Sequence, residues 1–394
     1  MNRDVVVTGI GVLSPVGTGK EDFWNALKEG RSGFKEISLF DTTRYRTNIG
    51  GEIAGFDPVE YLGKKGLRTL DRSTKLVCSA ARLALDDAGL DITPENEGSI
   101  GVSVGSTFGS LKSIAEFDRE GITEGPRYVN PSYFPNTVLN SPASNISIRF
   151  GIKGFNTTVS TGFCASLDAI MYASDFIRLN RADAVLAGGV EELCNETFLI
   201  FNELGYLSSS NEDSLSVDAP AVNGGLVLSE GSALCVLESE EHALKRSASI
   251  LARVAGYGNS FDPSINNGGQ SGLGLSRAII NALKEAGLDK NDIDLICCGV
   301  TATKSMIRTE FDLITDMFGD QTKIRSIDPS IRGSFSASGA MALSYGIGLI
   351  TGTDGNHPSV DTSSSDRNIH RVMVIASDPR GNNSAVVLER FEDE

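Results

Sequence analysis

The feature that most constrains the fold of this chain is an internal repeat. Ala80–Ile92 reads Ala-Ala-Arg-Leu-Ala-Leu-Asp-Asp-Ala-Gly-Leu-Asp-Ile, and Ala278–Lys290 reads Ala-Ile-Ile-Asn-Ala-Leu-Lys-Glu-Ala-Gly-Leu-Asp-Lys. In both stretches a helical spacing of apolar residues ends at a glycine, Gly89 or Gly287, and a β-rich segment follows. The two glycines are separated by about half of the 394 residues. Duplicated βαβ units packed as one body account for this length without three separate domains, so we predict an α/β fold of two related halves.

The composition and the first residues argue against a membrane span and a secretory signal. Hydrophobic residues make up 40% of the chain, but no run approaches the roughly 18 apolar residues of a membrane-spanning helix. The chain starts Met-Asn-Arg-Asp and continues as a β-like run, Val5–Gly11, rather than as a charged region with a long apolar segment. We therefore expect a cytoplasmic protein.

The charge and the cysteines exclude further classes of protein. The formal net charge is −16, which argues against nucleic acid or an anionic membrane as a ligand. None of the six cysteines has the CxxC spacing of a metal site, and most lie in apolar runs. We predict reduced, buried thiols, with no metal and no bound cofactor. These cysteines are Cys78, Cys164, Cys194, Cys235, Cys297 and Cys298.

One short stretch carries the pattern of a nucleophile turn. Thr157–Ser160 is β-prone, the pattern becomes helical from Ala165, and small residues fill the junction. Backbone N–H groups and the helix dipole at such a junction favour an anion and activate a thiol as its thiolate. Cys164 is the obvious candidate for the nucleophile.

The same stretch resembles a known family. Val159–Ile170, Val-Ser-Thr-Gly-Phe-Cys-Ala-Ser-Leu-Asp-Ala-Ile, is similar to the active-site segment V-S-T-G-C-x-S-G-L-D-A-V of β-ketoacyl-acyl-carrier-protein synthases, especially those of type II polyketide systems. The resemblance implies a thiolase-like fold of five layers, α-β-α-β-α. It divides the chain into an N-terminal half, residues 1–245 with an insertion at about 111–145, and a C-terminal half, residues 246–394. Further resembling stretches are the N-terminus through residue 33, Tyr133–Ser147, Ala184–Glu191 and Gly225–Gly231.

The nucleophile of that family is replaced in this chain. The two segments match in length only if Phe163 lies where the family has its reactive cysteine. Cys164 then falls one place late, and one residue of α-helix turns a side chain by about 100°. A phenyl ring has therefore replaced the thiol, and Cys164 is not a simple substitute for it.

The catalytic histidines of the family are also absent. The family uses two histidines, in H-G-T-G-T and G-H-x-x-G-A-A-G, to stabilise the charge of the enolate. Counting from Glu310 and from Ser336 places these positions at Gly299 and Gly333, and places the family's lysine at Asp328. The three histidines of the chain lie elsewhere, and we interpret them as surface or structural residues. They are His242, His357 and His370.

Other polar residues near these motifs fit structural roles. Ser377–Asn383, Ser-Asp-Pro-Arg-Gly-Asn-Asn, stands where the family has F-G-F-G-G-x-N, so the phenylalanine that gates access of the acyl chain is missing. Ser166 and Asp168 are interpreted as residues that cap or pack the helix after the turn. Gly9–Gly11 lacks the further spacing of a dinucleotide fingerprint. Three acidic residues match structural positions of the family: Glu191, Glu192 and Glu230.

We interpret the chain first as a catalytically degenerate ketosynthase-like subunit, similar to the chain-length factors of type II polyketide synthases. Such a subunit forms a heterodimer with an active ketosynthase, and acyl groups arrive on the phosphopantetheine of an acyl carrier protein. Because carrier proteins are acidic, the acidic charge of this chain indicates that the partner subunit docks them. The candidate acyl-pocket residues are Phe163, Cys164, Thr301, Thr303, Ser377 and Pro379.

Two alternatives remain open. In the first, the chain is an acyltransferase or condensing enzyme of altered chemistry, in which Cys164 accepts an acyl group beside the hydroxyls of Thr301 and Thr303 and passes it to water or an amine. In the second, it is a homodimeric acyl-binding protein without a condensing partner. Thiol reactivity at Cys164 separates the first alternative from the degenerate subunit, and co-purification with a Cys-His-His homologue separates the second.

Overall fold

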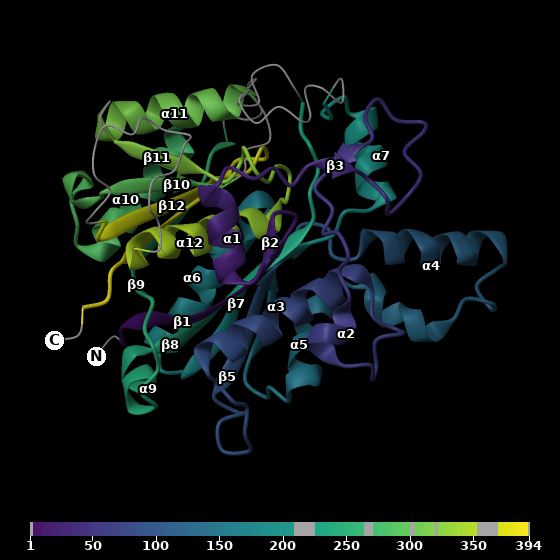
Figure 1. The fold of residues 1–394 in the computed structure, drawn as a ribbon, viewed down its shortest axis with the longest axis horizontal. Helices are drawn as coiled ribbons and strands as arrows, with labels where there is room; N and C mark the ends of the chain where they lie inside the picture. The colour runs from purple at the N-terminus through teal and green to yellow at the C-terminus, as the bar shows by residue number, and fades with distance from the viewer. Residues whose placement is uncertain are drawn as a thin grey trace.

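The computed structural model describes residues 3–208, 225–263, 271–299, 304–319, 322–352 and 369–392. In Figure 1 the strands form two groups, with helices between them and on both outer faces. The two groups are one continuous sheet in hydrogen-bonding terms, because β1 pairs with β9 over a short stretch at Val6 and Val7.

The two groups of strands have the same topology. The first is ordered β1-β8-β7-β5-β6 and the second β9-β13-β12-β10-β11, and in each the first three strands are antiparallel and the last three parallel. This identity of order and direction confirms the duplication predicted from the sequence repeat. The first group contains β1 (Val5–Ser14), β5 (Ile100–Gly105), β6 (Asn156–Val159), β7 (Ala184–Glu191) and β8 (Gly231–Ser239). The second contains β9 (Ala252–Phe261), β10 (Leu295–Cys298), β11 (Lys323–Ser326), β12 (Arg371–Ser377) and β13 (Asn382–Glu389).

The helices complete the five layers. α3 covers the outer face of the first group and α10 the outer face of the second, while α6 and α12 lie between the groups and contact strands of both (Figure 1). The principal helices are α1 (Lys20–Lys28), α3 (Arg72–Ala88), α4 (Leu111–Thr123), α5 (Ser141–Phe150), α6 (Ala165–Arg178), α7 (Asn195–Glu203), α10 (Leu273–Ala286), α11 (Lys304–Phe318) and α12 (Ser336–Thr351). The short elements are α2 (Pro58–Leu62), α9 (Glu240–Lys245), β2 (Gly17–Thr18), β3 (Lys35–Glu36), β4 (Ile49–Gly50) and the 3₁₀ helices η1 (Pro131–Thr137), η2 (Gly162–Cys164) and η4 (Lys290–Asp292).

The repeated sequences make the same close contact in each half. A Cβ atom at Gly11 of β1 would lie 2.0 Å from the carbonyl oxygen of Ala80 on α3, and one at Gly258 of β9 would lie 2.5 Å from that of Ala278 on α10. Each half therefore places an alanine-rich helix directly on a strand that has glycine at the contact. The glycines of β1 serve packing, which agrees with the rejection of Gly9–Gly11 as a dinucleotide site.

The central layer is the most apolar part of the fold. Every residue of α12 from Ser336 to Ile350 is buried, and the helix carries no charged side chain in that span. A helix that is apolar on all sides belongs in an interior, whereas α3 and α10 bury one face only. α12 therefore lies between the two groups of strands, and its N-terminus contacts the nucleophile turn.

Helix α4 lies in the segment that was expected as an insertion at about residues 111–145. Leu111–Thr123 forms α4, η1 follows it, and α5 begins at Ser141. None of the residues of α4 is fully buried, and Figure 1 shows the helix projecting from the body of the molecule. Its apolar face is only partly covered, for example where Phe117 meets Phe134 at 6.0 Å between ring centroids.

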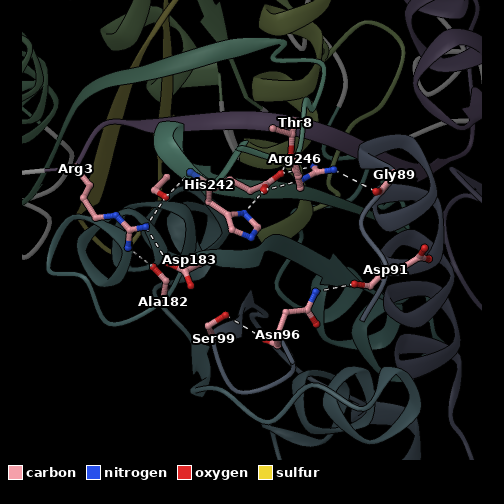
Figure 2. A network of polar contacts seen from close by, with 12 residues as sticks. Arg3, Thr8, Gly89, Asp91, Asn96, Ser99, Ala182, Asp183, His242 and Arg246 are labelled. Carbon is pink, nitrogen blue, oxygen red and sulfur yellow. Dashed lines mark hydrogen bonds and ion pairs between the residues drawn. The ribbon is translucent and has the colours of Figure 1, made fainter. Parts of the chain in front are cut away.

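A buried carboxylate fastens α9 to the sheet. Glu238 of β8 accepts hydrogen bonds from Thr8, from His242 Nδ1 and from Arg246 Nε at 2.9 Å, and Arg246 also donates to the carbonyl of Gly89 (Figure 2). Burial alone would raise the pKa of Glu238, but these donors outweigh it and lower the pKa to about 2. His242 therefore has a structural position, as expected.

Burial and helix length bear on the predictions made for the cysteines and for membrane spans. All six cysteines are buried and free, which confirms the predicted buried thiols. Among the described residues, no helix is both long enough and apolar enough to cross a bilayer. His370 approaches Glu392 at the surface, and His357 lies outside the described residues.

Candidate functional site

The nucleophile turn lies where the two halves of the chain meet. β6 ends at Val159, η2 forms the turn at Gly162–Cys164, and α6 starts at Ala165, as the sequence predicted. Gly162 has φ +70°, a conformation that L side chains rarely adopt. The turn faces the hairpin between β12 and β13 and the start of α12, so residues from both halves surround it.

Phe163, which the sequence aligned with the nucleophile of the resembling family, has a buried ring. Its side chain is 4% exposed, and its ring lies 5.1 Å from that of Phe335 between centroids. Phe335 in turn contacts Phe108 at 5.4 Å and Phe201 at 5.1 Å. We call these four residues the aromatic cluster. Rings packed at such distances bury large apolar areas, so no space remains for an acyl group at the position of the Phe163 side chain.

The backbone of Phe335 is strained to hold its ring in the cluster. Its φ is +42°, in the left-handed region that bulky residues avoid, and it directly precedes α12. Such a conformation costs roughly 1–3 kcal/mol and persists only where the surroundings enforce it. The packing of the aromatic cluster holds the backbone of Phe335 in this conformation.

Asp378 accepts the hydrogen bond of the backbone N–H group of Phe163 in the turn. The backbone N–H of Phe163 donates to Asp378 Oδ2 at 3.0 Å, and Asp378 is 1% exposed. The other oxygen, Oδ1, accepts from the backbone N–H of Arg380 at 2.8 Å, and Arg380 Nε lies 3.3 Å from it. An incoming acyl oxygen or carboxylate would have to displace this side chain to reach the N–H group of Phe163.

Cys164 points away from the aromatic cluster. Its thiol is fully buried and donates to the carbonyl of Ala376 at 3.3 Å, with the carbonyl of Asn382 at 3.4 Å. Burial raises the pKa of this thiol well above its usual value, and the negative charges of Asp168 and Asp378 raise it further. A thiol in these surroundings is held in its protonated, unreactive form.

The two positions aligned with the family's histidines differ in what they can accommodate. At Gly299 a Cβ atom would make ordinary contacts at 3.5 Å, with Ser338 and with the carbonyl of Ile375. At Gly333, where φ is +56°, a Cβ atom would lie 2.5 Å from the carbonyl oxygen of Val227. The backbone at Gly333 has therefore taken a course in which no larger side chain fits without rearrangement.

The other predicted pocket residues are only partly placed at the site. Ser377 and Pro379 lie on the β12–β13 hairpin that carries Asp378, and Ser377 is paired with Asn383 across it. Thr301 and Thr303 lie outside the described residues. A separate cleft of about 480 Å³ lies between α4 and the start of α3, and no residue of the aromatic cluster lines it.

The acidic residues near the turn hold the two halves together. Glu191 accepts from the backbone N–H groups of Thr107 at 2.9 Å and Phe108 at 3.1 Å, and from the hydroxyl of Ser336 at 2.7 Å. Burial raises the pKa of Glu191. Asp168 accepts from Ser384 at 2.6 Å, and its role agrees with the packing role expected for it.

The neighbouring polar residues also have structural positions. Ser166 Oγ accepts from the backbone N–H of Ala340 at 2.9 Å, which ties α6 to α12. Glu230 forms an ion pair with Arg72 at 2.5 Å. Burial raises the pKa of Glu192 to about 8, so this carboxyl is largely protonated at neutral pH.

Sequence reasoning missed the contacts that decide the chemistry of the turn. The segment containing Asp378 was singled out, but only for the loss of a phenylalanine. An aspartate in that segment could have indicated a hydrogen bond to the N–H groups of the turn. Phe335, Phe108 and Phe201 carried no local signal, because three distant segments bring their rings together.

Comparisons with known proteins agree with the geometry. The sequence matches the family models Beta-ketoacyl synthase, N-terminal domain, over residues 2–243 and Beta-ketoacyl synthase, C-terminal domain, over residues 251–350. It is 37% identical over 305 residues to 3-oxoacyl-acyl-carrier-protein synthase 2 of Vibrio cholerae serotype O1, which covers 76% of this chain and 74% of the relative. The corresponding protein of Staphylococcus aureus strain COL is 31% identical over 325 residues, 82% of this chain and 78% of the relative.

Solved structures give the same result over the whole chain. The ishigamide ketosynthase/chain length factor superposes with a TM-score of 0.87 and 28% identity, covering 100% of both chains. A beta-ketoacyl synthase from Burkholderia phymatum STM815 superposes with a TM-score of 0.86 and 26% identity, also covering 100% of both. The chain therefore belongs to the beta-ketoacyl synthase family, with the thiolase fold of its structural neighbours.

Proposed function

We propose that this chain is a ketosynthase-family subunit that does not itself perform decarboxylative condensation. Family membership relates the chain to the elongation of fatty acids and polyketides, in which acyl carrier proteins carry the acyl groups. Within that process, the proposed role is to pair with an active ketosynthase and to shape the space for its growing acyl chain, as a chain-length factor does.

The observation that carries this proposal is the state of the nucleophile turn. A condensing enzyme needs a thiolate at the turn and free donors for the acyl oxygen. Here the side chain at the turn is the buried ring of Phe163, and its N–H group donates to Asp378. Cys164, the adjacent thiol, is buried and has a raised pKa, which weighs against the alternative of an acyl group carried on Cys164.

The histidine positions add support. Two hydrogen-bond donors toward the thioester oxygen are lost at Gly299 and Gly333, and the backbone at Gly333, with φ +56°, has no room for a side chain. Restoring a thiol at the turn by one substitution would therefore still leave the enolate charge without its stabilising donors. The losses at the turn and at both histidine positions occur together, as expected for a subunit released from catalysis.

A surface suited to a partner lies on the side of β6. Within the described residues β6 pairs only with β5, so its other edge is open. Ile148 of α5 is 79% exposed, and Tyr172 and Leu179, on or just after α6, are also exposed. An open strand edge flanked by exposed apolar side chains favours a protein partner. A structural neighbour described as a ketosynthase/chain length factor supports an active ketosynthase as that partner.

The proposal is tested on the isolated chain by intact-mass spectrometry after incubation with acyl-loaded and malonyl-loaded carrier protein. We expect no acyl adduct and no release of carbon dioxide, for the wild type and for Cys164→Ala alike. An adduct that disappears in Cys164→Ala would overturn the proposal in favour of an acyltransferase.

The partner is tested separately by co-expression with Cys-His-His homologues and purification through a tag on this chain. We expect a stable one-to-one complex whose product length changes when residues of this chain at the shared acyl space are altered. A chain that purifies only as a homodimer and binds acyl groups without condensing them would support the acyl-binding alternative instead.

A further inference from the structure

A small cavity beside α11 contains a buried carboxyl group with one oxygen that has no hydrogen-bond partner. The cavity measures about 160 Å³ and is bordered by α11, β10, β11 and the segment at Asp328–Pro329. Glu310 lines it and is 7% exposed, and its Oε2 atom is buried without a hydrogen-bond partner. Such an orphaned oxygen is costly in a folded protein unless a ligand satisfies it.

The charged groups that the described residues bring to the cavity do not balance. Glu310 and Asp328 bring two carboxyl groups to the cavity, and Arg332, 3.4 Å from Asp328 Oδ2, supplies one positive charge. The Cys298 thiol also lines the cavity, and it donates to Glu310 and stays protonated because burial raises its pKa well above the usual value. When both carboxyls are ionised, these described residues carry one more negative charge than positive charge.

Without a ligand, a proton balances that negative charge. Burial raises the pKa of Glu310 to about 7, while the Cys298 hydrogen bond lowers it less. Burial also raises the pKa of Asp328 to about 6, against the lowering effect of Arg332. A cation that reached Glu310 would take the place of this proton.

Apart from Ser326, the remaining walls of the cavity are apolar. Ile307, Ile314 and Ile324 line it, and Phe311, which is exposed, lies at its border and leaves it open to the surface of α11. A cavity of about 150 Å³ holds a molecule the size of benzene. The site therefore fits a ligand with a short hydrocarbon body and one cationic head that donates hydrogen bonds.

We propose that this cavity binds a small primary alkylammonium of about four to six carbons. The ammonium group donates to Glu310 Oε2, and the hydrocarbon body lies among Ile307, Ile314 and Ile324. Gly299 and Asp328, the positions aligned with one histidine and with the lysine of the family, also line this cavity, so it adjoins those positions. Binding of the ammonium ion does not depend on whether the chain catalyses condensation.

The test is calorimetric titration of the full chain with n-butylammonium chloride at pH 8.5, with sodium chloride and n-butanol as controls. We expect saturable one-to-one binding of the ammonium ion, and binding of n-butanol weaker on the order of 10-fold or more, because the charge-assisted hydrogen bond is lost. At pH 5.5 binding should weaken on the order of 30-fold, because the ligand must displace the proton of Glu310, whose pKa is about 7.

Variants separate the site from a general effect of charge. Glu310→Gln should weaken binding on the order of 10-fold or more, and Asp316→Asn, which changes an exposed carboxyl on the same helix, should leave it unchanged. Ile307→Phe, which fills the cavity, should abolish binding in a folded protein and so keeps the test valid if Glu310→Gln is unstable. The proposal is overturned if n-butylammonium does not bind, or if n-butanol or the Ile307→Phe variant gives the same affinity.

Discussion

A cysteine placed at Phe163 should stay a poor nucleophile until the charge of Asp378 is also removed. The N–H group of Phe163 donates to Asp378 Oδ2 at 3.0 Å, so a side chain at this position starts beside a buried carboxylate. The thiolate is the reactive form of cysteine, and a neighbouring negative charge disfavours it. The comparison is Phe163→Cys against Phe163→Cys combined with Asp378→Asn, both with Cys164→Ala to remove the adjacent thiol.

The size of the effect follows from the geometry. Two unit charges roughly 5 Å apart repel by about 3 kcal/mol at an effective dielectric constant of about 20. This energy raises the pKa of the new thiol by about two units, which slows alkylation on the order of 100-fold near neutral pH. Arg380 Nε lies 3.3 Å from Asp378 and offsets part of the repulsion, so a difference of about 10-fold is the lower bound.

The assay is the rate of iodoacetamide alkylation from pH 6 to pH 10, with the adduct assigned to position 163 by peptide mass spectrometry. Asparagine keeps an oxygen that accepts from the N–H group, so the two proteins differ chiefly in charge. Thermal unfolding of both proteins checks that they are folded. Equal rates across the whole pH range would refute the reasoning, because the charge of Asp378 would then have no influence on the turn.

Three further results are expected. Gly333→Ala should destabilise the protein by on the order of 2–3 kcal/mol in urea unfolding, because φ is +56° and Val227 O lies 2.5 Å from the new Cβ, whereas Gly299→Ala should cost less than about 1 kcal/mol. Glu238 has a pKa of about 2 in the folded protein against an ordinary 4.5. Its ionised form therefore contributes about 3 kcal/mol to the free energy of unfolding above pH 4.5, and this contribution is lost as the pH falls toward 2. Glu238→Gln should flatten the fall in the free energy of unfolding, measured with urea from pH 7 to pH 3. Ile148→Asp should disrupt the complex with the ketosynthase partner in size-exclusion chromatography, and Ile280→Asp, an exposed isoleucine on α10, should not; equal effects would place the partner elsewhere.

The duplication of the fold was predictable because it rests on local patterns. The helices at Ala80–Ile92 and Ala278–Lys290 show their apolar spacing and end at glycines in the left-handed conformation, Gly89 and Gly287. Helix α4 was not predicted, although its apolar residues recur at helical spacing; none of its residues is fully buried. The order of the strands, by contrast, depends on contacts between distant residues that no single stretch specifies.

The candidate site was predictable in its position and not in its contacts. The resemblance to the family motif predicts the turn at Phe163 and the two histidine positions at Gly299 and Gly333. The hydrogen bond from Phe163 to Asp378 joins residues 215 positions apart, and the sequence contains no local pattern for it. The conformation of Phe335 is likewise set by tertiary packing, since a bulky residue does not adopt a φ of +42° by its own preference.

The central claim is that this chain carries no acyl intermediate while its partner does. The most direct measurement is native mass spectrometry of the purified complex with an active ketosynthase, after incubation with excess acyl-loaded carrier protein. The account predicts one acyl group per one-to-one complex, located on the partner subunit after dissociation in the gas phase. Two acyl groups per complex, or an acyl group on this chain, would contradict it.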